Sequence, residues 1–273
     1  MIVDLHTHTT ASDGKLTTSD LVLRAMKYRL NMLSITDHDT VAGYTTMPDF
    51  DKGQLIIIPG IEFSTSWKNI EIHVLGLNIQ PDNSAIIEGV SKQSELRWDR
   101  AEKIARKLQK LGINGALEGA GNKSKNRNIG RPHFAEYLVE IGFVKDINQA
   151  FSKYLSPGKP CYIRQNWASL KQVVAWINTA GGVAVLAHPA RYKLTRTKLL
   201  ELLGDFIKCG GGGMEVITGK SSSVLTSHLT SVCKKMGLKA SCGSDFHQPG
   251  QPWSEIGQFP RLPEQCIPVW DNW

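Results

Sequence analysis

Cysteine is scarce in this sequence of 273 residues, and it forms none of the patterns that bind metal or build a disulfide framework. The five cysteines are an odd number, and no two of them form a C-x-x-C pair. We therefore expect neither a thiolate metal site nor a disulfide-stabilised fold. A reducing cytoplasm is the location that this cysteine usage favours.

Long apolar runs and nucleotide-cofactor signatures are also missing. No apolar stretch reaches the roughly 18 residues of a membrane span, and the first residues lack the basic and apolar regions of a signal peptide. Neither a P-loop nor a G-x-G-x-x-G fingerprint is present, which excludes the common nucleotide-cofactor classes. Acidic residues are outnumbered, and the formal net charge of +7 favours anionic partners such as nucleotides or RNA.

The pattern of apolar residues predicts an α/β fold built from alternating strands and helices. Short apolar runs predict strands at 2–5, 32–36, 55–63 and 70–77, with Pro59 and Gly60 breaking the third near its end. Thr17, Thr18 and Ser19 are cap-forming residues before a helix. Strand–helix alternation resumes after residue 166, so a parallel sheet or barrel is expected.

The middle of the chain has a different character. Residues 83–155 contain no convincing strand, and a long amphipathic helix stops at Gly112. Residues 112–131 are rich in Gly and Asn and predict a mobile loop, followed by short helices near 132–141 and 146–155. We expect a first barrel part at 1–82, a helical insertion domain at 83–165, and a second barrel part at 166–273.

Histidines and carboxylates cluster where the predicted strands end. In βα architectures this edge carries the functional groups. His-x-His on a strand places both rings on one side, and the same holds for Asp245 and His247. Imidazole suits Zn, Fe and Mn, while carboxylates can bridge ions. Nine candidate ligands exceed the need of one ion, with Glu62 as a plausible bridge: His6, His8, Asp13, His38, Glu62, His73, His188, Asp245 and His247.

Each of these residues also has a simpler explanation. A single strand histidine is more often packed or hydrogen-bonded than metal-bound, and Asp13 in ASDG could form a turn. Asp37 and Asp39 could cap helices or orient ligands, and we favour the second role. The joint occurrence at successive strand ends favours a metal site. Clustered ions activate water and neutralise a phosphoryl group during in-line displacement, which predicts a phosphoesterase.

The motifs HTH with SDG, TDHDT, PGIE, IHVLGL, AHP and GSDFH resemble the PHP (polymerase and histidinol phosphatase) family over residues 4 to 247. The resemblance implies a distorted (β/α)7 barrel with a mainly helical insertion and two or three divalent ions. Manganese is the first choice, with iron or zinc as alternatives. It also implies three ligand groups: His6, His8, Glu62 and Asp245; Glu62, His73 and His188; and Asp13, His38 and His247. Through these ions we expect catalysis to depend on His6, His8, Glu62, Asp245 and His247.

Within the family, ALEGA (116–120), GRPHFAEYLVE (130–140) and FSKYLSPGKPCYI (151–163) resemble the group of nucleoside 3′,5′-bisphosphate phosphatases and ribonuclease AM, a 5′-to-3′ exoribonuclease. The resemblance implies attack at the 3′-phosphorus of a nucleotide with a 5′-phosphate. The expected partners are therefore nucleotides or single-stranded 5′-phosphorylated RNA, with no membrane and no obligate protein partner.

Three residues are candidates to clamp phosphate, because a guanidinium matches phosphate with two hydrogen bonds. They are Arg131, His133 and Arg191. Arg131 could instead be a solvated loop residue, and His133 could cap the helix near Pro132. Basic residues of the long helix and loop could also track an RNA backbone, or form a solvated face: Arg97, Arg100, Lys103, Arg106, Lys107, Lys123, Lys125 and Arg127.

Other functions remain open at this point. A small-molecule phosphatase of the histidinol-phosphatase type would share the metal site, although it would not need a basic helical insertion. A non-catalytic metal-binding PHP module is a second alternative, but such a module is expected to lack ligands. An amidohydrolase-type barrel also uses H-x-H, and its usual carboxylated lysine has no counterpart here.

Overall fold

The computed structural model describes residues 1–47, 49, 53–124 and 128–273. Its seven strands pair in chain order: β1 (Val3–Asp4), β2 (Met32–Ile35), β3 (Ile56–Trp67), β4 (Ile70–Leu77), β5 (Val183–Leu186), β6 (Gly213–Thr218) and β7 (Lys239–Gly243). The first and last strands also meet, because the Leu5 amide donates to the Cys242 carbonyl at 3.0 Å and the His8 amide donates to the Phe246 carbonyl at 2.9 Å. The sheet is thus a nearly closed seven-stranded barrel, as predicted.

The direction of one strand departs from the all-parallel expectation. Strand β4 runs antiparallel to both β3 and β5, while the other pairs are parallel. The cause is a two-residue hairpin turn at Lys68 and Asn69, both of which have positive φ. Such a turn returns the chain beside the strand that it has just left, with no room for a crossover helix.

The predicted break at Pro59 and Gly60 is wrong, because β3 continues through them to Trp67. These two residues mark a change of neighbour instead. Residues 56–59 pair with β2, and residues 60–67 pair with β4. Gly60 is needed at this point because a Cβ there would lie 2.3 Å from Ser34 Oγ. Pro59, which has no N–H to donate, still accepts from the Ile79 amide at 3.4 Å.

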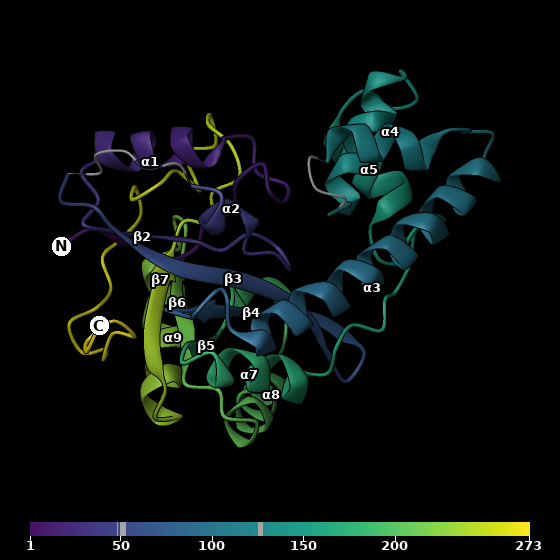
Figure 1. Cartoon of the computed structure of the whole chain (residues 1–273). Helices are drawn as coiled ribbons and strands as arrows, with labels where there is room; N and C mark the ends of the chain where they lie inside the picture. The colour runs from purple at the N-terminus through teal and green to yellow at the C-terminus, as the bar shows by residue number, and fades with distance from the viewer. Residues whose placement is uncertain (48, 50–52, 125–127) are drawn as a thin grey trace.

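Helices cover the outside of the barrel (Figure 1). Helix α1 begins after Thr17, whose side chain accepts from the Asp20 amide, as the cap-forming sequence predicts. The main apolar cluster lies between strands β3 to β7 and the later helices. The covering helices are α1 (Thr18–Lys27), α2 (Ala42–Thr45), α7 (Leu170–Thr179), α8 (Arg196–Lys208) and α9 (Ser223–Lys235), with a short 3-10 helix at Pro189–Tyr192.

The segment between β4 and β5 is helical in its described part. Helix α3 (Ser84–Gln109) leaves the barrel and carries the next elements at its far end (Figure 1). These are α4 (Ala116–Lys123), α5 (Arg131–Glu140), α6 (Ile147–Ala150) and a π-helix at Phe151–Leu155. They bury an apolar cluster of their own, separate from that of the barrel. The division at residues 83 and 165 stays a prediction.

The predicted loop at 112–131 is partly wrong, because α4 occupies its centre. Ala116 and Ala120 are buried, and a Cβ at Gly119 would lie 2.1 Å from the Tyr137 ring. The small residues that predicted a loop therefore let α4 pack closely on α5. Lys125 and Arg127 lie outside the described residues.

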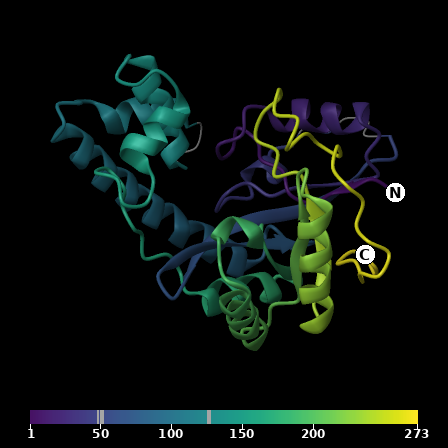
Figure 2. The ribbon, with the colours of Figure 1, turned by 180° about the vertical axis from the view of Figure 1, so that it is seen from behind.

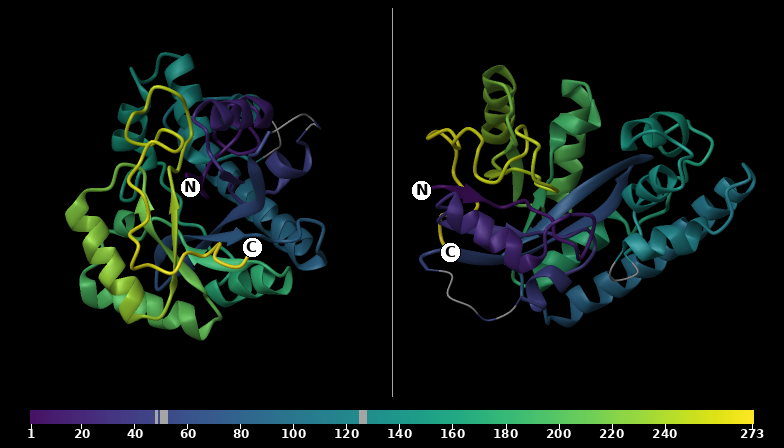
Figure 3. Two further views of the ribbon diagram at one scale, coloured as in Figure 1. Left: turned by 90° about the vertical axis from the view of Figure 1, so that its left-hand side faces the viewer. Right: turned by 90° about the horizontal axis from the view of Figure 1, so that it is seen from above.

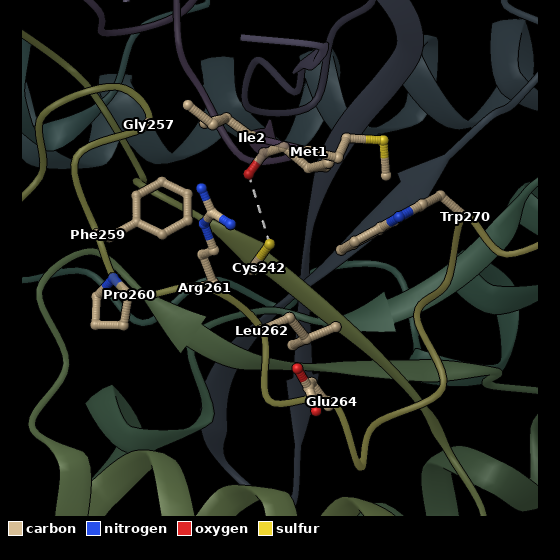
Figure 4. A pocket seen from close by; sticks show the side chains of 11 residues that line it. Met1, Ile2, Cys242, Gly257, Phe259, Pro260, Arg261, Leu262, Glu264 and Trp270 are labelled. Carbon is tan, nitrogen blue, oxygen red and sulfur yellow. Dashed lines mark hydrogen bonds between the residues drawn. The ribbon is translucent and has the colours of Figure 1, made fainter.

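The segment after β7 passes α1 and then returns to pair with β7 through Pro268 (Figures 2 and 3). Arg24 of α1 forms a two-point ion pair with Glu255 of this segment, at 2.8 and 2.5 Å. Further along, Phe259, Leu262 and Trp270 line a pocket of about 340 Å³ beside Met1 (Figure 4). None of the nine predicted ligands lines this pocket. In the described part of the chain, no helix is long and apolar enough to cross a bilayer.

Candidate metal centre

The nine predicted ligands come together at one side of the barrel. His6 and His8 follow β1, His38 follows β2, His188 follows β5, and Asp245 with His247 follows β7. The prediction that Glu62 ends its strand is wrong, since β3 extends five residues beyond it. His73 lies within β4. Their donor atoms form four overlapping groups, in each of which all atoms lie within 4.8 Å: His8, Asp13, His38 and His247; His6, Glu62 and His188; His6, His8 and Asp245; and His38, Glu62 and His73.

Glu62 lies at the centre of this cluster. One carboxylate oxygen, Oε1, lies 2.9 Å from His73 Nδ1 and 3.0 Å from His188 Nε2. The other, Oε2, lies 3.3 Å from the Nε2 atoms of both His6 and His8. A single carboxylate thus faces histidines on both of its oxygens. This is the arrangement expected of a carboxylate that bridges two ions.

A second carboxylate organises the outer side of the cluster. Asp13 Oδ1 lies 3.4 Å from His247 Nε2, and Asp13 Oδ2 lies 3.8 Å from His38 Nε2. His8 and His247 stack with ring centroids 4.1 Å apart. The short turn that carries Asp13 therefore directs its side chain into the cluster. A residue that only formed a surface turn would point to solvent instead.

The donor set fits divalent ions. Among the described residues, seven cluster atoms are buried without a hydrogen-bond partner, although one of them, Asp245 Oδ2, has an ion pair with Arg191. The others include His6 Nε2, His8 Nδ1 and His188 Nδ1. Buried polar atoms without partners are rare, because each costs about 1–3 kcal/mol. Ions bound among these atoms would remove that cost.

Without ions, the charge states of Glu62 and His8 already suit metal binding, whereas neighbouring carboxylates raise the pKa of His6, His38 and His247. Burial opposes ionisation of Glu62, but His38, His6 and His73 hold its pKa well below the usual range. Burial and the neighbouring His247 lower the pKa of His8 to about 3. The carboxylate is thus charged and this imidazole is neutral at pH 7, which are the forms that bind metal.

A cavity of about 120 Å³ joins the cluster to a group of arginines. Its lining includes Asp13, His38 and His73 of the cluster together with three arginines, Arg97, Arg100 and Arg131. The three guanidinium groups face two carboxylates. Asp39 pairs with Arg97 at 2.5 Å, and Glu71 pairs with Arg100 at 3.0 Å and Arg131 at 3.3 Å. The arginines thus outnumber by one the carboxylates with which they pair, while Asp13 also lines the cavity. Among the described residues, the buried Arg100 Nε atom has no hydrogen-bond partner.

Comparison with known proteins identifies the family of the chain. The PHP domain family matches residues 4–180. The chain belongs to the PHP family. It is 42% identical to the 5′-3′ exoribonuclease Rnm of Escherichia coli, over 100% of this chain and 94% of that one. It is 40% identical to the 3′,5′-nucleoside bisphosphate phosphatase of Chromobacterium violaceum, over 98% of this chain and 95% of that one.

A solved structure matches this PHP fold closely. It is described as an amidohydrolase from Chromobacterium violaceum with bound sulfate and no metal. Its TM-score is 0.90 at 38% sequence identity, and the match covers 99% of this chain and 95% of that chain. The barrel and the helical segment between β4 and β5 are therefore shared as one arrangement.

The three predicted phosphate ligands have different positions in this PHP site. Arg131 lines the arginine cavity. Arg191 forms an ion pair with Asp245 at the metal cluster. His133 is buried, and its Nδ1 accepts from the Gly130 amide at 2.9 Å, which is the capping role that the sequence also suggested. Binding of phosphate by any of them stays a prediction.

The basic residues of α3 divide into two sets. Arg97 and Arg100 are buried and line the cavity. The sequence had suggested either contact with an RNA backbone or a solvated face, and neither of these predicts burial. Lys103 and Arg106 are exposed and form i,i+4 pairs with Asp99 and Glu102. The solvated-face interpretation therefore describes the second set only.

Sequence reasoning missed one buried carboxylate beside the PHP ligands. Glu215 Oε1 lies 3.0 Å from His6 Nδ1, and its Oε2 accepts from the His188 amide at 2.6 Å. It thereby orients one ligand ring and the backbone of another, a role that tunes metal sites. The available signal was an acidic residue inside the apolar strand GMEVIT.

The two aspartates that were expected to orient ligands do contact the loops around them. Asp37 accepts from the Thr9 amide at 2.8 Å, from Thr9 Oγ1 at 2.6 Å and from Ser12 Oγ at 2.6 Å. It therefore holds the turn that presents Asp13. Asp39 accepts from Ser64, Gln93 and Arg97, which ties α3 to β3 beside His38.

Proposed function

We propose that this PHP chain is a metal-dependent phosphoesterase that hydrolyses the 3′-phosphoester of nucleotides bearing a 5′-phosphate. Nucleoside 3′,5′-bisphosphates and the 5′-phosphorylated end of single-stranded RNA present the same bond. The observation that carries the proposal is the cavity in which a metal-type cluster faces Arg97, Arg100 and Arg131. The names of the E. coli and C. violaceum relatives support the same substrate class.

The nine ligand-type residues would hold two or three divalent ions, of which we propose manganese as the native one. Bound ions would supply an activated water and would neutralise the phosphoryl oxygens. Glu62 would keep neighbouring ions together, and Glu215 would keep His6 in its orientation. Five free cysteines agree with a cytoplasmic location.

The protein's own cations would position the substrate. Arg191 lies at the cluster beside Asp245, where it would contact the phosphate that is attacked. The three cavity arginines would bind the 5′-phosphate, because several guanidinium groups at one cavity offer a dianion charge-assisted hydrogen bonds. With the 5′-phosphate held by the arginines, the 3′-phosphate of the same nucleotide would reach the ions. Its phosphoester would then be the bond that is cut.

The test compares adenosine 3′,5′-bisphosphate with adenosine 3′-monophosphate, with manganese added and with a chelator as control. Wild type should prefer the bisphosphate. Arg131→Met should lower kcat/KM on the bisphosphate by about 10- to 100-fold, the usual worth of a charge-assisted hydrogen bond or two. The same change should have little effect on the monophosphate.

Arg106→Met is the matched control, since that arginine lies on the exposed face of the same helix segment as Arg97 and pairs only with Glu102 among the described residues. It should leave both substrates unaffected. Equal loss on both substrates in Arg131→Met would contradict a 5′-phosphate site. A wild type that releases no product from either substrate would refute the proposed activity.

A further inference from the structure

A second, larger cavity lies beside the cluster, to which Arg191 and Tyr192 in its lining are joined by contacts with Asp245 and His73. Its volume is about 750 Å³, within the range of about 300–1,000 Å³ typical of ligand sites. It shares Glu71 and Arg131 with the arginine cavity, and it reaches Arg191 beside Asp245. The two cavities are therefore neighbours that share part of their lining.

The walls of this groove come from four separate segments, one of which is the start of α5 with Arg131. The β3–β4 hairpin supplies residues 69–71, and the turn after β5 supplies residues 191–192. The opposite wall is the chain that returns from the helical segment, with Pro157, Gly158, Tyr162 and Arg164. A ligand lying here would contact the barrel on one side and the inserted segment on the other.

The chemistry of the groove is cationic and aromatic. Arg131, Arg164 and Arg191 line it, against a single carboxylate, Glu71, which is already paired. Arg164 is exposed and has no ion-pair partner among the residues that the structure describes. The Arg131 guanidinium lies over the Tyr162 ring, 5.6 Å from its centroid, so a cation and an aromatic ring are neighbours in the groove. Cations that follow a backbone and rings on which bases stack are the features of single-stranded nucleic acid sites.

We propose that this groove binds the nucleotide on the 3′ side of the bond that is cut, in single-stranded RNA. The inference rests on the proposed function, and it adds a subsite that a nucleoside bisphosphate does not fill. Tyr162 stacks on the second base, and Arg164 contacts the phosphate that follows it. The groove thus selects RNA chains over free bisphosphates, with the chemistry at the ions unchanged.

The Tyr162 backbone is held independently of its ring, so the side chain can be removed without releasing the segment. Its carbonyl accepts from Lys107 Nζ at 3.0 Å, and its amide donates to the Lys159 carbonyl at 3.1 Å. The neighbouring Cys161 is buried, and its amide donates to the Tyr154 carbonyl at 2.9 Å. Tyr162→Ala therefore tests the ring, with Tyr162→Phe as the variant that keeps it.

The experiment measures kcat/KM on a 5′-phosphorylated pentanucleotide RNA and on adenosine 3′,5′-bisphosphate, and uses the ratio of the two. Tyr162→Ala and Arg164→Ala should each lower the RNA-to-bisphosphate ratio about tenfold, the order of one stacked base or one phosphate contact. Tyr162→Phe should restore it. With wild type, an RNA that lacks the second base should react about tenfold more slowly than the intact RNA. With Tyr162→Ala, the two RNAs should react at the same rate.

Two outcomes of the kinetic experiment would overturn the inference. An unchanged ratio in both variants would show that the groove does not bind the RNA chain. An equal loss on both substrates would assign the groove to the first nucleotide. If wild type hydrolyses neither substrate, the proposed function fails, and the groove is then judged by fluorescence anisotropy of the same labelled RNA. Binding that Tyr162→Ala weakens about tenfold would support the groove, and unchanged binding would refute it.

Discussion

The ion pair between Arg97 and Asp39 gives a sharp test of how the long helix is fixed to the barrel. Arg97 lies on α3, and Asp39 is fully buried beside β3, with 2.5 Å between Arg97 Nη2 and Asp39 Oδ2. Arg97→Met keeps the length of the side chain but leaves a buried carboxylate without its cation. Removing one partner of a buried pair costs about 3–5 kcal/mol.

We expect the lower end of that range, about 3 kcal/mol. Asp39 keeps hydrogen bonds from the Ser64 amide at 2.7 Å, from Ser64 Oγ at 2.8 Å and from Gln93 Nε2 at 2.9 Å. In a protein of this size, 3 kcal/mol lowers Tm by roughly 6–12 °C. The measurement is thermal and urea-induced unfolding, followed by tryptophan fluorescence.

Two further variants make the reasoning refutable. Arg106→Met removes an exposed cation from the same helix and should change the unfolding free energy by less than about 0.5 kcal/mol. Asp39→Asn combined with Arg97→Met should be more stable than the sum of the two single changes, because no charge is then left buried. A loss below about 1 kcal/mol in Arg97→Met, or strict additivity in the double variant, would refute this account.

Three other outcomes are expected. Chelation should lower Tm, and added manganese should restore it, because bound ions stabilise only the folded chain. At a metal concentration about 1,000 times Kd, the gain in unfolding free energy is roughly 4 kcal/mol. An unchanged Tm would argue against metal among the buried cluster atoms that lack hydrogen-bond partners. Gly119→Val should destabilise by about 1–3 kcal/mol through its clash with Tyr137, while Gly121→Ala, whose Cβ would meet nothing closer than 3.8 Å, should be tolerated in the same unfolding assay. Alkylation at pH 8, followed by mass spectrometry, should modify Cys209 first, because it is half-buried while the other four cysteines are buried. Burial raises the pKa of Cys233 to about 12, so early labelling of Cys233 would contradict the fold.

The sequence sufficed to predict which residues meet at the cluster, because parallel strands end at one edge and the ligand types follow those ends. His6, His38, His188 and Asp245 illustrate this, each lying just after its strand. Glu62 and His73 are the exceptions. Their position depends on the antiparallel hairpin at Lys68 and Asn69, whose pairing register is a tertiary property.

Other parts of the site could not be predicted from local patterns. Arg97 and Arg100 recur on a helix face that is indistinguishable in sequence from the exposed Lys103 face, and only packing against the hairpin buries them. Glu215 belongs to a strand that is buried on both faces, where no alternation marks the side that points to the ligands. The helix at 116–123 has small residues whose purpose depends on Tyr137, a partner distant in sequence.

All nine ligand-type residues lie outside the segment between β4 and β5, whereas the arginine cavity and the RNA groove each take one wall from it. Chemistry and recognition are thus encoded in different stretches of one chain. Substitutions in the inserted stretch that keep the contacts of Gln93 and Arg97 with Asp39 can alter what is bound while the nine ligand-type residues stay in place. Related barrels are therefore free to acquire new substrates by evolving this stretch alone, and exchange of the stretch between relatives is a direct route to altered specificity.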